Sequence, residues 1–188
     1  EIRGNDWRDE DPVAGIGWEP GLLESLRIQL KTAISCPRDQ RIGEYLLGCL
    51  DNRGYLAVTV DEIAAALNVD VDEVEAVRRV LLNLEPVGIG SRDLQECLSA
   101  QIRAMQLDED LSRLALQVVA AHLEDIAAGK LGKAASATGA PLARVQEAVD
   151  LIRRLNHAPG AGLSGDGEVR YITPDVYIER VDGEYIVI

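Results

Sequence analysis

Apolar side chains recur at helical spacing along most of this chain. An interval of three or four residues is typical of an amphipathic helix with one buried face. The first two such runs consist of Leu22, Leu26, Leu30 and Ile34, then Ile42, Tyr45, Leu46, Cys49 and Leu50. Pro20 and Pro37 suit the starts of these helices, because a first helical turn leaves its N–H groups unused. Gly54 follows the second run and can adopt the left-handed backbone that ends a helix.

Two capping boxes mark the next pair of helices. Thr59 precedes Glu62 by three positions and Asp70 precedes Glu73 by three, so each pair can satisfy free amide groups in a first turn. The first helix of the pair ends at Asn68, and the second carries the apolar face that includes Leu81. A short helix, a tight turn and a longer helix predict a helix-turn-helix-like pair.

The same layout returns later in the chain. A short helix follows Lys130, Gly139 provides a turn, and a longer helix starts at Pro141. Two further helices are predicted between the pairs, one through Leu94–Met105 and one from Asp108 through Ile126. We therefore predict a mainly α fold with two small helical subdomains, each containing one helix-turn-helix-like pair.

The period changes near the end of the chain. Residues 175–181 alternate between polar and apolar, Asp182-Gly183 is a favoured two-residue turn, and residues 184–188 begin a return strand, which together predict a C-terminal β-hairpin segment. The predicted divisions are an acidic linker at 1–19, an N-terminal helical subdomain at 20–106, a C-terminal one at 107–160, and a linker with the start of the hairpin at 161–188. Because it starts at Glu1 and stops within a strand, the chain is expected to be a fragment.

The net charge of the chain says more about its possible partners than the rest of the composition does. The formal net charge is −13, whereas affinity for DNA comes largely from lysine and arginine displacing counterions. Three separated cysteines, Cys36, Cys49 and Cys97, are expected to be small core residues of a protein in the reducing cytosol. The longest apolar runs fall short of the roughly 18 residues that a membrane span needs, so a cytoplasmic protein with no membrane partner is expected.

Residues capable of chemistry are scattered. Gly160, Gly162 and Gly165 spell G-x-G-x-x-G, but a dinucleotide fingerprint must follow a strand and open a helix, so these glycines predict a flexible linker. His122 and His157 have no second ligand or nucleophile nearby in sequence. We expect no cofactor, no metal and no catalytic residue, and the pattern favours a binding module rather than an enzyme.

The helix-turn-helix-like pairs leave one alternative open, which is an autonomous DNA-binding transcription regulator. The second pair carries the basic residues Lys130, Lys133, Arg144, Arg153 and Arg154. In the first pair the longer helix begins with four carboxylates, at Asp70, Asp72, Glu73 and Glu75. Those charges oppose phosphates where a recognition helix would meet them, so the exposed face of the first pair favours a protein partner.

The stretch Glu85-Pro-Val-Gly-Ile-Gly-Ser-Arg-Asp-Leu-Gln-Glu-Cys-Leu98 resembles a long, specific motif of the bacterial RNA polymerase sigma-54 (RpoN) factors. Supporting matches are Ile42-Gly-Glu44, Leu50-Asp-x-x-Gly-Tyr-Leu56, Thr59-x-Asp-Glu-Ile-Ala64, Leu155-Asn-x-x-Pro-Gly160 and Tyr171-Ile-x-Pro-Asp-Val176. The chain departs from the motif at Glu85, where Asp is usual, and at Ser91, where Ala is usual.

The resemblance implies a core-binding domain preceded by part of the family's acidic region. The implied partners are core RNA polymerase and, in the full-length factor, an enhancer-bound ATPase activator that drives open-complex formation. Promoter DNA would be read mainly by a C-terminal domain outside this chain. By the same resemblance, the acidic residues 1–19 would occupy a path otherwise open to DNA.

The motif itself predicts a junction between two helices. Pro86, Gly88 and Gly90 are expected to stop one helix and turn the chain, and Ser91 to cap the next helix with Asp93 in its first turn. Leu94, Cys97 and Leu98 are expected to bury one face of that helix. The candidates for contact with polymerase are Arg92, Asp93, Gln95, Glu96 and Gln101. Whether the motif only builds the junction or also touches the partner stays open from the sequence.

Overall fold

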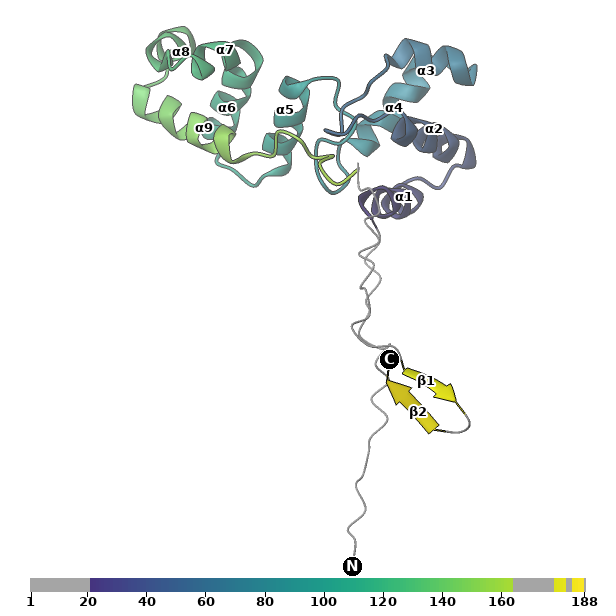
Figure 1. Cartoon of the computed structure of the whole chain (residues 1–188). Helices are drawn as coiled ribbons and strands as arrows, with labels where there is room; N and C mark the ends of the chain where they lie inside the picture. The colour runs from purple at the N-terminus through teal and green to yellow at the C-terminus, as the bar shows by residue number, and fades with distance from the viewer. Residues whose placement is uncertain (1–20, 164–177, 182–183, 188) are drawn as a thin grey trace, which may run out of the picture.

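The computed structural model describes residues 21–163 together with the backbone of two strands, 178–181 and 184–187. Within these ranges the chain is mainly helical (Figure 1). The elements are α1 (Leu22–Ala33), α2 (Pro37–Gly48), α3 (Val60–Leu67), α4 (Val71–Leu81), α5 (Leu94–Ala104), α6 (Glu109–Ala121), α7 (Leu123–Ala127), α8 (Leu131–Thr138), α9 (Leu142–Arg154), β1 (Ile178–Val181) and β2 (Glu184–Val187).

Helices α1 to α4 enclose the first hydrophobic core. Leu26 and Leu30 of α1 are fully buried there, as are Leu46 of α2 and Leu81 of α4. The predicted start of α1 at Pro20 lies outside the described residues, and Pro37 occupies the first turn of α2 as predicted. These leucines come from the apolar faces that the sequence pattern defines, so local amphipathicity and tertiary packing agree here.

Local capping signals place the ends of α3 and α4 correctly. The Thr59 hydroxyl accepts a hydrogen bond from the Glu62 amide, and the Glu62 carboxylate accepts one from the Thr59 amide. Asn68 ends α3 in the left-handed conformation, with φ of 53°. The Glu73 carboxylate accepts from the Asp70 amide at 3.2 Å at the start of α4.

Helices α5 to α9 surround a second core. Leu98 and Ile102 of α5 are fully buried among residues of α6 and α9, such as Val118 and Val149. The packing therefore groups α5 with the later helices, whereas the sequence-based division at 106/107 groups it with the earlier ones. An apolar helix face shows that a helix is covered, but it does not show which neighbour covers it.

The single helix predicted from Asp108 through Ile126 is instead two helices, α6 and α7. The break falls at His122, where the backbone leaves the helical conformation with φ of −130° and ψ of 14°. Its ring Nδ1 lies 3.3 Å from a carboxylate oxygen of Asp125 in the first turn of α7. The apolar face continues past the break, since Ile126 of α7 is buried in the second core. Apolar spacing alone therefore could not reveal that the backbone breaks at His122.

The chain returns to the first core after α9, along the segment 155–163 (yellow-green in Figure 1). The Gly160 amide donates to the Arg53 carbonyl at 2.8 Å, and the Tyr55 hydroxyl donates to the His157 carbonyl. A Cβ on Gly160 would lie 2.3 Å from the Gly54 nitrogen, so only glycine permits this approach. Gly160 is therefore part of a packed contact, which contradicts its prediction as a flexible linker. Gly165 lies outside the described residues.

Strands β1 and β2 form an antiparallel two-stranded ladder, with Ile178 opposite Val187 and Val181 opposite Glu184. The predicted turn at 182–183, the acidic segment 1–19 and the stretch 171–176 lie outside the described residues. Of the three cysteines, Cys97 is buried and Cys49 is partly buried, but Cys36 is exposed. The prediction of a core position was wrong for Cys36, which lies just before α2 at the surface.

Candidate functional site

The junction between α4 and α5 turns the chain sharply through two glycines. Gly88 and Gly90 have φ values of +96° and +79°, a region that favours glycine. There is also no space for a side chain: a Cβ would lie 2.8 Å from the Cys97 sulfur at Gly88, and 2.8 Å from a Leu81 methyl carbon at Gly90. The predicted turn is confirmed, and it brings the start of α5 back toward α4.

The residue that caps α5 is Asp93, not Ser91 as the sequence predicted. The Asp93 carboxylate accepts from the Glu96 amide at 2.8 Å. Ser91 is fully buried two residues earlier, where its hydroxyl donates to the Gly88 carbonyl and its own carbonyl accepts from the Leu56 amide. Ser91 therefore fixes the turn to the first core, and the helix begins only after that bridge ends.

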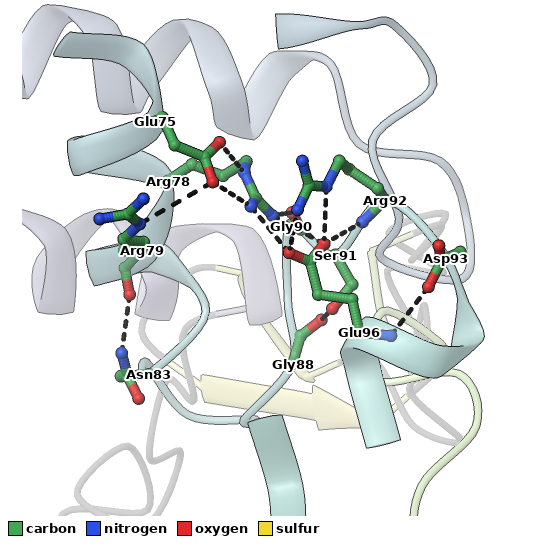
Figure 2. Close-up of polar contacts among 10 residues, drawn as sticks. All are labelled: Glu75, Arg78, Arg79, Asn83, Gly88, Gly90, Ser91, Arg92, Asp93 and Glu96. Carbon is green, nitrogen blue, oxygen red and sulfur yellow. Dashed lines mark hydrogen bonds and ion pairs between the residues drawn. The ribbon is translucent and has the colours of Figure 1, made fainter. Parts of the chain in front are cut away.

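A buried arginine ties the junction together (Figure 2). Arg78 of α4 is 1% exposed, and its guanidinium donates to both oxygens of Glu75 at 2.8 and 2.6 Å. It also donates to both oxygens of Glu96 at 2.8 Å and to the Gly90 carbonyl at 3.1 Å. The planar guanidinium of Arg78 thus links α4, the glycine turn and α5. Its paired hydrogen bonds to each carboxylate have the bidentate geometry that arginine favours.

The network extends outward through Arg92. Its guanidinium donates to Glu96 at 2.9 Å, and its backbone amide donates to the same carboxylate at 2.7 Å. Arg92 itself keeps 59% of its side chain exposed, whereas Glu96 keeps only 18%. Glu96 therefore serves as an internal anchor that holds Arg92 at the surface.

Charge pairing sets the ionisation of these groups. Burial alone would raise the pKa of Glu96, but hydrogen bonds from Arg78 and Arg92 override it and lower that pKa to about 2. The hydrogen bond from Arg78 also lowers the pKa of Glu75. Burial would lower the pKa of Arg78, yet its bonds to both carboxylates raise it instead. These shifts favour the charged forms of Glu75, Arg78 and Glu96 at neutral pH.

The five predicted contact residues divide into two kinds. Arg92, Asp93 and Gln95 are exposed on the outer side of the junction, and Asp93 additionally caps α5. Glu96 and Gln101 are used inside the fold: the Gln101 amide nitrogen donates to the Asn156 carbonyl at 2.7 Å, and its oxygen accepts from the Asn156 amide at 2.9 Å. This pair of bonds holds the return segment against α5.

The apolar part of the motif packs much as predicted. Cys97 and Leu98 are fully buried, while Leu94 is partly buried against the second core. Pro86 is also partly buried, beside the turn. Burial raises the pKa of the Cys97 thiol, so this sulfur is a packing group and not a reactive thiolate.

Sequence reasoning missed Arg78, although a signal for it was present. Arg78 lies four residues after Val74 and three before Leu81, so it occupies the apolar face of α4. A charge at such a position needs a partner. Glu75, one turn earlier, is close enough to supply one, but Glu96 comes from another helix and its role depends on the tertiary turn.

Possible metal-binding groups and membrane-spanning helices can be searched for among the described residues. There, no group of three or more His, Cys, Asp or Glu side chains is arranged to hold a metal ion. Nor does any helix within those residues have the length and apolar character to cross a membrane. A charge-balanced network that presents one arginine and a capped helix start is suited to recognising another macromolecule.

Comparison with known proteins shows the family to which this chain belongs. Residues 16–188 match the family described as "Sigma-54 factor, core binding domain", and the chain belongs to this family. It is 34% identical over 185 residues to the RNA polymerase sigma-54 factor of Azorhizobium caulinodans, which covers 98% of this chain and 35% of that protein. It is 35% identical over 145 residues to the Bacillus subtilis sigma-54 factor, covering 77% of this chain and 33% of that one.

A solved structure agrees with this assignment. The structure described as Aquifex aeolicus sigmaN bound to promoter DNA has a TM-score of 0.51 and 26% sequence identity, and the match covers 88% of this chain and 45% of that one. The chain spans about a third of the length of the two curated relatives above. The resemblance inferred from the 85–98 motif is therefore confirmed at the level of the family.

Proposed function

We propose that this chain is the part of an enhancer-dependent sigma factor that docks on core RNA polymerase. The observation that carries the proposal is the family match over residues 16–188, whose description names a core-binding domain. The junction of α4 and α5 supplies a rigid, partly exposed surface for such docking. Its exposed members Arg92, Asp93 and Gln95 are the proposed contacts.

The preorganisation of Arg92 supports this assignment. Glu96 holds its guanidinium and its backbone amide, so little rotamer freedom is lost when a partner binds. We propose that Glu96 contributes by positioning Arg92. Gln101 contributes by holding the return segment 155–163 against α5. Direct contact is assigned to the exposed side chains alone.

The test is binding to purified bacterial core RNA polymerase, with Arg92→Ala as the probe. We expect the variant to keep its helical circular dichroism and to lose about tenfold in affinity, the effect of one good charged contact. Arg113→Ala is a matched control, since Arg113 is a similarly exposed arginine (61% of its side chain) on α6. Unchanged affinity of a folded Arg92→Ala protein would leave Arg92 a purely structural residue.

Direct binding to DNA is the second candidate, favoured by the neighbour that was solved with promoter DNA. The basic residues of the second pair are already engaged in part: Lys133 pairs with Asp125 at 2.9 Å, and Arg144 pairs with Asp108 at 2.9 Å. Salt-sensitive affinity for random duplex, without binding to polymerase, would favour an autonomous regulator.

The wider role is proposed for the whole factor, of which this chain spans a part. That factor would direct polymerase to promoters, read promoter DNA mainly through a C-terminal domain, and depend on an enhancer-bound ATPase activator. It would work in the cytoplasm, where transcription in bacteria takes place. We also propose that the two hydrophobic cores define two subdomains, followed by the hairpin segment.

A further inference from the structure

A groove of about 570 Å³ lies beside the ion network. It runs between the stretch 56–62 and the start of α4, and Arg92 and Glu75 line it where it meets the junction. The groove is therefore continuous with the surface proposed above to meet polymerase. Its lining combines apolar and acidic side chains, and each kind restricts what can bind there.

Two valines give the groove an apolar part. Val58 is 38% exposed and Val71 is 42% exposed, and both line the groove. Exposed apolar side chains are ordinary when they stand singly. Here two of them share one concave surface, and burial of that surface by a partner would be favourable in proportion to the area covered.

The four acidic residues that line the groove are not equivalent. Glu62 is engaged with Thr59, and Glu75 is held by Arg78. Asp61 and Asp72, in the first turns of α3 and α4, are exposed and make no ion pair or side-chain hydrogen bond among the described residues. The equivalent acids of α6 behave differently.

Glu109 and Asp110 in the first turn of α6 both lie within ion-pair distance of Arg113, at 3.1 and 3.5 Å. They show that first-turn carboxylates of this chain can be neutralised by their own helix. Asp61 and Asp72 are left to attract an external cation instead, across a groove whose lining holds four carboxylates and one guanidinium.

We propose that this groove binds a segment of core RNA polymerase in which a lysine or arginine lies next to an apolar side chain. The apolar side chain packs on Val58 and Val71, and the cation lies between Asp61 and Asp72. This inference rests on the proposed polymerase-binding function and assigns a particular surface and partner chemistry to it. Complementary charge at an interface sets the association rate and its salt dependence.

The experiment compares two double charge reversals in the full 188-residue chain. Asp61→Lys/Asp72→Lys alters the groove, and Glu109→Lys/Asp110→Lys alters matched first-turn positions on α6 with the same change in net charge. Each protein is fluorescently labelled and titrated with purified bacterial core RNA polymerase at low and high salt. We expect the groove variant to bind about tenfold more weakly at low salt and the control to stay within about twofold.

A third variant, Val71→Ser, tests the apolar part alone. It should weaken binding about fivefold at both salt concentrations, because lost apolar burial is not screened by ions. Circular dichroism confirms that each variant is folded. If wild-type and groove variant bind equally well, the groove proposal is overturned while the polymerase-binding function stands. If the wild-type chain does not bind polymerase, the proposed function is overturned and the groove proposal with it.

Discussion

Replacing Arg78 with methionine tests the central claim about the junction. Arg78 donates five hydrogen bonds, four of them to carboxylates, from a position that is 1% exposed. Methionine retains an apolar stem of similar length, so the change removes mainly the charge and the donors. Glu75 of α4 and Glu96 of α5 would then lose the cation between them, and Arg92 would remain as the ion-pair partner of Glu96.

The size of the effect follows from burial. Removing one partner of a buried ion pair costs about 3–5 kcal/mol, because the other charge is left uncompensated. The two carboxylates here remain 18–19% exposed, so water can partly solvate them after the change. We therefore expect the lower end of that range, about 3 kcal/mol of unfolding free energy.

The measurement is urea unfolding followed by far-UV circular dichroism at neutral pH. Arg79→Met is the control one residue along α4, since Arg79 is 73% exposed and lies 3.9 Å from its nearest carboxylate oxygen. A surface pair of this kind should change stability by less than about 0.5 kcal/mol. The reasoning about the junction fails if Arg78→Met lowers the free energy of unfolding by no more than Arg79→Met does.

Three further changes test other parts of the structure. The folded-state pKa of Glu96 is about 2, below its ordinary 4.5. Its contribution to stability is therefore present above pH 4.5 and is lost as pH falls toward 2. When the free energy of unfolding is measured as a function of pH, Glu96→Gln should reduce the loss of stability between pH 4.5 and 2. Gly160→Ala should lower the midpoint of thermal unfolding by a clash worth about 2 kcal/mol, whereas Gly162→Ala, whose Cβ would lie 3.5 Å from its nearest neighbour, should leave it unchanged. Leu98→Asp would bury an unpaired charge and should abolish amide protection in the second core; retained protection would show that the side chain escapes to solvent.

Capping and amphipathic spacing predicted the helices well, because both signals lie within a few residues. Thr59 and Glu62 meet across one turn, so their pairing is already specified locally. Ser91 looked like an equally good cap, but its backbone bridges to residues 55 and 56, and that bridge displaces the helix start to Asp93. Local capping signals cannot include such a long-range contact.

The candidate site was predictable as a segment but not as a network. The 85–98 motif contains the proposed docking surface, and the glycine turn was correctly inferred from Gly88 and Gly90. The assignment of Glu96 as a possible contact did not foresee its use by Arg78, which lies 18 positions earlier in the chain. Tertiary geometry alone brings α4 and α5 close enough to share one guanidinium.

The path of the chain has a consequence for dissecting this protein. Helix α5 leaves the first group of helices to complete the second core, and the segment 155–163 comes back to cover residues 53–55. A fragment that ends at residue 106 would lack the segment 155–163, which packs on residues 53–55. A fragment that starts at residue 107 would lack Leu98 and Ile102 of the second core. No single cut yields two intact halves, so a protease nick in a loop should leave fragments that co-elute until denaturant separates them.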